Sequence, residues 1–374
     1  MKIITTDYEN KKFWEETEKE SALMGDCMHV VNICPDVTYQ TFHGFGGALT
    51  EAAAHVYAGM SKEKQDEIIE AYFGKTGLRY NIGRIHMNSC DFALGNYTYV
   101  EEGDDKLETF DISHDRKEIL PFLAAANAKT AEGTNTKGLK LLMSPWSPPA
   151  FMKTNGEMNH GGKLKDEYYA AWAEYFVKFI RAYQEAGADI QWLTVQNEPM
   201  AVQTWDSCIY TSEDESRFVR DYLGPKLEDA GLSDIGIFVW DHNKEEGYQR
   251  FKEVIADEKT RKYVKGGPNH VGNFCAAPIM CAPGEDSYEK RLTYYYIGHF
   301  SRYIKEGAVK IGTSRYTDGI EVTAFLNPDG ERVAVILNKS EKEVPYTLRE
   351  MTKDAGYQGV EGVIAPHSIQ TIVY

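Results

Sequence analysis

Strand-like and helix-like segments alternate through much of the chain, and this alternation limits the fold more than any other feature of the sequence. Each strand-like segment is short and apolar, ends in polar or small residues, and precedes a long stretch with helical periodicity. The five segments are Phe45–Thr50, Tyr80–Met87, Lys140–Ser144, Ile190–Val195 and Ile235–Trp240. This order indicates a parallel sheet with crossover helices, in either a (β/α)8 barrel or a doubly wound sheet.

The clearest helical stretch is Tyr168–Ala186, in which aromatic residues and alanine recur every four positions, at Ala171, Tyr175, Phe179 and Tyr183. Such spacing places the apolar side chains on one face of a helix, which we expect to pack against the sheet.

From about Ala308 the pattern changes to strand-like alternation. The runs Glu321–Leu326 and Arg332–Leu337 flank the sequence Asn-Pro-Asp-Gly at 327–330. Proline fixes one φ angle and glycine accepts a positive one, so this segment predicts a hairpin turn. The last part of the chain is therefore expected to form a small antiparallel β-domain. The tyrosine-rich stretch 294–301 before it is expected to pack between the two parts.

Composition excludes several classes of protein. The 374 residues include 41 Lys+Arg and 57 Asp+Glu, a net charge of −16 without a basic run, which argues against nucleic acid as a partner. No window has the roughly 18 apolar residues of a membrane span. Residues 1–12 lack the apolar core of a signal peptide, so we expect a cytoplasmic protein. The six cysteines and ten histidines lack metal-ligand spacing, and no metal or cofactor is expected.

Polar groups follow the strand-like segments. In a parallel barrel the loops after the strands meet on one face, where function resides. The groups are His43–Ala48, Asn88–Asp91, Ser144–Pro149, Asn197–Pro199 and Asp241–Asn243. Carboxylates and amides pair with hydroxyl groups and an indole ring covers an apolar ring face, so this set suits a sugar. The glycines at 44, 46 and 47 do not match a phosphate-binding loop.

The most informative group is Asn197-Glu198-Pro199, which follows an apolar strand. A glutamate at a strand end among aromatic residues can act as a general acid and base. Asn197 could hold a sugar 2-hydroxyl, a contact that strengthens in the transition state of glycoside hydrolysis. A simple turn closed by Pro199 remains the alternative interpretation.

Several longer motifs together resemble glycoside hydrolase family 30, the group that includes the glucosylceramidases. The motifs are Phe42–Ala53, Tyr80–Phe92, Ser144–Asn155, the strand into Asn197-Glu198-Pro199, Gly267–Phe274 and Gly298–Ser301. The resemblance implies retaining hydrolysis of a β-linked glycoside such as a β-glucoside, with a small carbohydrate substrate and no metal. It also implies a (β/α)8 barrel, residues 41–305, fused to a β-sandwich made of residues 1–40 and 306–374.

The resemblance also implies roles for single residues. Glu198 matches the acid/base of the family and Asn197 its neighbour. The other matches are Asp91, Trp146 and Asn269 at sugar-contacting positions, Arg84 as a supporting arginine, and Trp205 and His242 as pocket-lining residues.

One part of the family pattern is not found in this sequence. The motifs that end the sixth, seventh and eighth barrel strands, including the glutamate nucleophile, have no counterpart. Arg261–Gly266, which resembles the start of the sixth strand, runs directly into Gly267–Asn269, which resembles the end of the eighth. At about 30 residues per unit of a ~250-residue barrel, roughly 80–90 residues are missing. We therefore expect an incomplete barrel with about five of eight units.

A retaining glycosidase needs a second carboxylate about 5–5.5 Å from the acid/base. The substitutes near in sequence are Asp241, Glu285, Asp286 and Glu289, for which loop or cap roles are favoured. The alternatives to an active hydrolase are a catalytically silent carbohydrate-binding protein and a deletion product. The sequence leaves the oligomeric state open, a homo-oligomer included.

Overall fold

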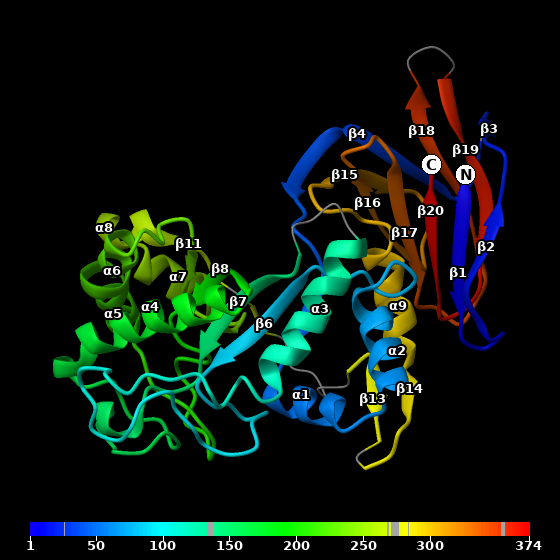
Figure 1. Ribbon diagram of the computed structural model, residues 1–374. Helices are drawn as coiled ribbons and strands as arrows, with labels where there is room; N and C mark the ends of the chain where they lie inside the picture. Colours follow the sequence, from blue (N-terminus) through cyan, green and yellow to red (C-terminus); the bar gives the residue numbers. More distant parts are fainter. Residues whose placement is uncertain (26, 134–137, 268, 271–276, 283, 353–355) are drawn as a thin grey trace.

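The structure is a computed structural model that describes residues 1–374 except residues 26, 134–137, 268, 271–276, 283 and 353–355. It has two parts that lie side by side: a parallel sheet with its helices, and a ten-stranded curled sheet (Figure 1). None of the helices in the described ranges combines the length and the apolar character needed to cross a membrane.

The parallel sheet has six strands in the order β11-β9-β8-β7-β6-β5, and every neighbouring pair is parallel. The strands are β5 (Gly46–Ala48), β6 (Ile82–Met87), β7 (Lys140–Pro145), β8 (Asp189–Thr194), β9 (Gly236–Phe238) and β11 (Val264–Gly266). The first five lie within two residues of the predicted segments. β11 adds a sixth strand to the five that were expected, because the segment that resembles the start of a sixth strand does pair with β9.

Helices follow the strands in sequence and pack with them into one core. They are α1 (Glu51–Ala58), α2 (Lys62–Phe73), α3 (Ile119–Gly133), α4 (Tyr169–Glu185), α5 (Ser212–Phe218), α6 (Gly224–Asp229), α7 (Gly247–Val254) and α8 (Glu258–Tyr263). The long predicted helix is α4, and its apolar face is buried, including Trp172, Phe176 and Phe179 at 0% exposure. The burial of each such side chain contributes roughly 1.5–3 kcal/mol to the stability of the fold.

The two faces of the parallel sheet differ in burial. On β7, Leu141 and Met143 are buried in the core shared with the helices, while Leu142 between them is only partly buried. Because side chains alternate across a strand, Leu142 points to the other face. Trp192 of β8, its partner in register, is also partly buried. The second face of the sheet is therefore less well covered.

The curled sheet combines both ends of the chain. Its N-terminal strands are β1 (Lys2–Asp7), β2 (Lys12–Glu18), β3 (Ala22–Leu23) and β4 (Val30–Thr41), and its C-terminal strands are β15 (Val309–Arg315), β16 (Ile320–Leu326), β17 (Arg332–Asn338), β18 (Val344–Thr352), β19 (Gly356–Ile364) and β20 (Ser368–Val373). β1 lies between β2 and β20, and β4 between β15 and β18. The predicted hairpin is β16–β17. The expected joining of the N-terminal segment to the C-terminal strands is present.

Helix α9 (Leu292–Ser301) joins the two parts, after the hairpin of β13 (Ile279–Cys281) and β14 (Tyr288–Lys290). His299 of α9 is fully buried, and its ring nitrogens lie 2.8 Å from the hydroxyls of Thr6 in β1 and Thr371 in β20. The Trp14 indole N–H donates to the Tyr295 carbonyl at 2.8 Å. The tyrosine-rich stretch thus packs at the junction, as expected from the sequence.

Burial lowers the pKa of His299 to about 3, with a smaller effect from the Arg302 charge. A histidine whose folded pKa lies below its unfolded value of about 6.5 contributes stability above pH 6.5 and loses it as the pH falls towards 3. We therefore predict that the His299→Gln variant loses about 2 kcal/mol less stability than the wild type between pH 7 and pH 5. Urea unfolding at the two pH values measures the difference.

The control for this prediction is His43→Gln, since His43 is exposed. That variant should lose as much stability as the wild type on acidification. Equal losses for His299→Gln and the wild type would contradict the assignment of the acid sensitivity to the buried ring.

Candidate functional site

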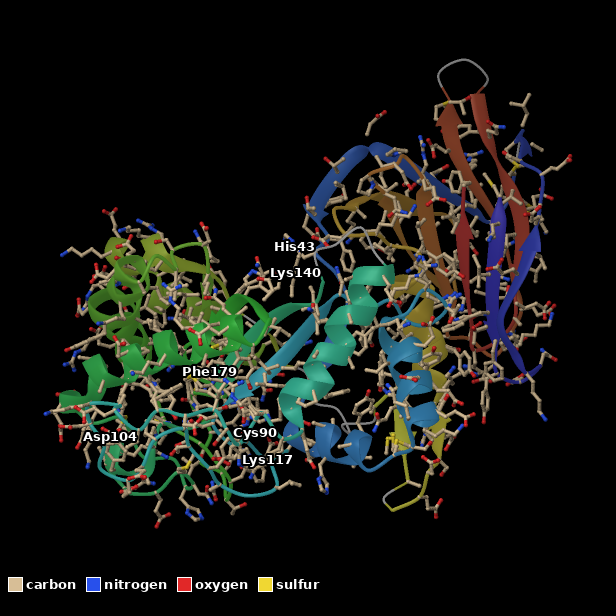
Figure 2. The ribbon with its side chains drawn as sticks, viewed as in Figure 1. His43, Cys90, Asp104, Lys117, Lys140 and Phe179 are labelled. Atoms are coloured by element: carbon tan, nitrogen blue, oxygen red, sulfur yellow. The ribbon has the colours of Figure 1, made fainter. Side chains whose placement is uncertain are left out.

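The polar groups predicted at strand ends lie mostly at the carboxyl ends of the parallel sheet. Figure 2 shows Cys90, which follows β6, at the opposite end of the sheet from Lys140, which begins β7. His43 and Gly44 are an exception: because they precede β5, they lie at the amino ends of the strands. The candidate site is therefore built from the loops after β6, β7, β8 and β9.

Glu198 follows β8 and is held by its backbone. Its N–H donates to the Asp241 carbonyl and the Asn197 N–H donates to the Pro145 carbonyl, both at 2.8 Å. The side chain is half-buried. The backbone of Glu198 has a φ angle of +47°, in the left-handed region. Asn88 after β6 and Trp240 after β9 also have positive φ angles. Such residues cost about 1–3 kcal/mol each and cluster at functional sites.

Arg84 of β6 joins three strand ends. Its Nη2 donates to Asn197 Oδ1 at 2.8 Å and to Asp241 Oδ2 at 2.7 Å, and its Nε donates to Ser144 Oγ at 3.1 Å. The guanidinium also lies over the Trp146 ring, 4.7 Å from its centroid. The structure therefore brings together Arg84, Trp146 and Asn197, beside the backbone of Glu198.

Asp241, considered from the sequence as a substitute nucleophile, is 1% exposed. Its Oδ2 accepts from Arg84 and from Ser144 Oγ, the latter at 3.0 Å. A buried carboxylate that balances an arginine is not exposed to attack a substrate, so the geometry favours a supporting role.

The acidic residues of the β13–β14 segment lie elsewhere. Asp286 accepts the Ser61 N–H at the start of α2, at 2.8 Å. Glu285 and Glu289 are exposed in the same hairpin. These three residues belong to a solvated surface and a helix cap, in line with the favoured interpretation of the sequence.

Asp91 lies in the loop after β6, at the rim of the site, and is exposed. Partial burial of the carboxyl raises the pKa of Asp91, and the negative charge of Glu198 raises it further. The two predicted carboxylates are therefore close enough to interact.

Three loops around the site are tied to one another. Ser89 Oγ donates to Asp206 Oδ1 at 2.6 Å, and the buried Lys153 ammonium donates to the Ser207 carbonyl at 2.6 Å. Burial lowers the pKa of Lys153 to about 8. Trp205 lies in the tied loop with 38% of its surface exposed, so its ring is accessible from solvent at the rim.

The last two predicted residues lie on a two-stranded element. His242 is in β10 (His242–Asn243), which pairs in parallel with β12 (Asn269–His270), and its ring centroid is 5.1 Å from that of Trp240. The backbone of Asn269 is opposite His242. The side chain of Asn269 lies outside the described part of the structure.

Sequence reasoning missed Glu215 of α5. This residue is fully buried, and its Oε1 accepts the Trp240 N–H at 3.0 Å, next to Asp241. Burial raises the pKa of Glu215 to about 7. The only signal in the sequence is its position on the inward face of a short helix, which does not distinguish it from other helical glutamates. Within the described ranges, no three His, Cys, Asp or Glu side chains gather as metal ligands.

Replacing Arg84 should destabilise the fold. In Arg84→Met the carboxylate of Asp241 stays buried but loses its cationic partner, and we expect a loss of about 3 kcal/mol in the free energy of unfolding, measured with urea. The double variant Arg84→Met/Asp241→Asn should recover most of this loss, since the buried charge is removed as well.

The matched control is Arg217→Met, because Arg217 pairs with the exposed Asp166 at 2.9 Å. An exposed pair contributes less than about 1 kcal/mol. Equal effects of the two arginine substitutions would contradict the special role of Arg84.

Comparison with known proteins gives the same two-part organisation. The protein-family model described as "Glycosyl hydrolase family 30 TIM-barrel domain" matches residues 42–266 and 264–304. A second family model, "Glycosyl hydrolase family 30 beta sandwich domain", matches residues 307–372. The lysosomal acid glucosylceramidase of Mus musculus is 28% identical over 439 residues, which cover 92% of this chain and 83% of the mouse protein. An endo-1,6-beta-D-glucanase of Aspergillus fumigatus is 25% identical over 400 residues, covering 83% of this chain and 80% of the glucanase.

Among solved structures, SrfJ from Salmonella typhimurium superposes with a TM-score of 0.92 at 29% identity, over 100% of this chain and 99% of that chain. The overall architecture and the order of the motifs are therefore those of the matched family.

Proposed function

Because the chain belongs to glycoside hydrolase family 30, enzymes that hydrolyse the O-glycosyl bonds of β-glycosides, we propose that Glu198 is its proton donor and that the carboxyl ends of β6 to β9 bind a β-glucoside. The chain by itself supplies the binding site and the acid/base. We further propose that it lacks the second carboxylate, which lies on a segment that its relatives have.

The position of Glu198 is the observation that carries this proposal. Its backbone follows β8, and its neighbour Asn197 has its amide oxygen fixed on Arg84 at 2.8 Å. The NH2 group of the same amide can then donate to a sugar hydroxyl. A contact to the 2-hydroxyl strengthens as the oxocarbenium-like transition state forms. Glu198, the next residue, is partly exposed, and its carboxyl is proposed to protonate the leaving oxygen.

Asp91, Trp146, Trp205, His242 and Asn269 are proposed as further sugar-contacting or pocket-lining residues on the strength of the family match. Asp91 has the best support, because it interacts electrostatically with Glu198. Trp146 is 9% exposed and carries Arg84 on one ring face, so contact with a sugar would involve only the small exposed part of the ring.

Two features of the comparisons support the missing segment. The family model matches in two parts that overlap only at Val264–Gly266, the place where the motif for the start of the sixth strand runs into the motif for the end of the eighth. The alignment with the mouse enzyme is 439 residues long, whereas 92% of this chain is about 344 residues, so about 95 positions stand opposite gaps in this chain. That number corresponds to about three βα units of roughly 30 residues each.

The first aspect of the proposal concerns binding. We predict that calorimetry detects weak binding of glucose, with a dissociation constant in the millimolar range, and that Asn197→Ala weakens it at least about fivefold, the effect of one lost hydrogen bond. Glu198→Gln should bind within about twofold of the wild type. Asn10→Ala, in the turn between β1 and β2, is the matched control and should leave binding unchanged.

The second aspect concerns the nucleophile. An activated 2-deoxy-2-fluoro β-glucoside forms a stable glycosyl ester with the nucleophile of a retaining glycosidase, and mass spectrometry of the chain should show no such adduct. An adduct on any carboxylate of the chain would refute the absence of the nucleophile. Equal glucose binding by the wild type and Asn197→Ala would refute the location of the sugar site. The cytoplasmic location expected from the sequence stays a prediction.

A further inference from the structure

The parallel sheet ends at two unpaired edges within the described residues. β5 pairs only with β6 and β11 pairs only with β9. All three residues of β5 are exposed. A parallel barrel has no edges when it is closed, and an open strand edge presents unpaired backbone groups to another polypeptide. The edges of β5 and β11 are therefore places where further parallel strands can add.

The sheet face between these edges is only partly covered and carries several large apolar side chains. Ile82, Leu142, Trp192 and Phe238 come from four neighbouring strands, and each is partly buried. In register, Leu142 lies beside Arg84 on one side and Trp192 on the other. The other face of the same strands is buried under the helices. Large apolar side chains that stay only partly buried on one face of a sheet indicate an interaction surface.

A cavity lies at the amino ends of the same strands. Its volume is about 900 Å³, and it is lined by Asn81 before β6, Lys140 of β7, Gln191 of β8 and the turn at Pro328 and Asp329. The loops that lead into the strands of a barrel lie at this end. The two open edges and the partly covered face, with the cavity at the amino ends of the same strands, are here called the open half of the barrel.

We propose that the open half of the barrel binds a separate polypeptide of about three βα units, and that the two chains together form a closed barrel with glycosidase activity. The occupant follows from the length that this chain lacks, because about 95 positions of the mouse relative stand opposite gaps. The junction at Val264–Gly266 lies in β11, one of the two open edges. A second copy of this chain is not the proposed occupant, because it would bring its own half-barrel and a β-domain in place of the missing units.

The expected activity rests on the function proposed above. A carboxylate of the added polypeptide attacks the anomeric carbon, the bond from that carbon to the glycosidic oxygen breaks, and the proton of Glu198 passes to the leaving oxygen. Water then attacks the glycosyl ester and returns its proton to Glu198, so that sugar and carboxylate are both released. Neither chain alone holds both carboxyl groups under this proposal.

The test uses the full chain and, as the probe, the stretch of SrfJ between the residue that superposes on Gly266 and the residue that superposes on Gly267. The two polypeptides are produced in the same cells and purified by a tag on the SrfJ stretch. We expect a one-to-one complex by sedimentation, and hydrolysis of an aryl β-glucoside at least about tenfold above either polypeptide alone. A general acid contributes about 10²–10⁴-fold, so a complex made with Glu198→Gln should lose most of this hydrolysis while still assembling.

Two variants of the surface test where the polypeptide binds. Leu142→Glu places a charge on the half-covered face, and Ala48→Pro alters the open edge of β5; each should reduce complex formation at least tenfold while the thermal unfolding of the chain remains cooperative. The matched control is Tyr248→Glu, a substitution on α7 at a residue that is 80% exposed, which should leave assembly unchanged.

The outcomes separate this inference from the proposed function. Absence of the complex, or a chain that is itself a dimer through the same face, overturns the inference. A complex that assembles and is equally active with Glu198→Gln overturns the role of Glu198 and leaves the inference standing. A complex that assembles without any hydrolysis overturns the claim that the joined chains form an active enzyme.

Discussion

The ion pair between Arg84 and Asp241 holds the candidate site together. Arg84 comes from the second strand of the sheet and Asp241 follows the fifth, and Ser144, from the third strand, donates to the same carboxylate oxygen. A buried carboxylate of this kind requires its partner, since an isolated charge in the interior is costly. The pair therefore links the order of the strands to the chemistry: only with these strands side by side do Arg84 and Asp241 meet, and only then is the amide of Asn197 fixed next to Glu198.

Much of the fold was predictable because it depends on local periodicity. The strands β5 to β9 and the helix α4 follow from apolar patterns whose period is read directly from the sequence, and the hairpin β16–β17 follows from turn chemistry at 327–330. β11 was harder, since three residues carry almost no periodic signal and its pairing with β9 depends on neighbours distant in sequence. The joining of both chain ends in one sheet came from the family resemblance and not from the pattern of residues.

The site was predictable to a different degree. The grouping of Trp146 and Asn197 follows from their places at strand ends, since parallel strands deliver these positions to one edge of the sheet. Arg84 lies within β6, and its place in the site came from the family resemblance. The role of Asp241 could not be read from the sequence, because exposure and partners decide whether a carboxylate attacks or supports, and both are tertiary properties. The same reason hid Glu215, whose burial against Trp240 depends on how α5 packs beside the sheet.

The placement of β1 beside β20 affects how the molecule assembles during synthesis. Lys2 of β1 pairs with Val373, the last residue of β20, so β1 must wait until β20 has been synthesised before this part of the sheet can form. The parallel sheet, by contrast, is built from consecutive segments and can form first. Pairings between such distant residues carry a high entropic cost of loop closure and slow the folding of a chain. The curled sheet is therefore the late step, and α9, through His299, is the element on which it closes.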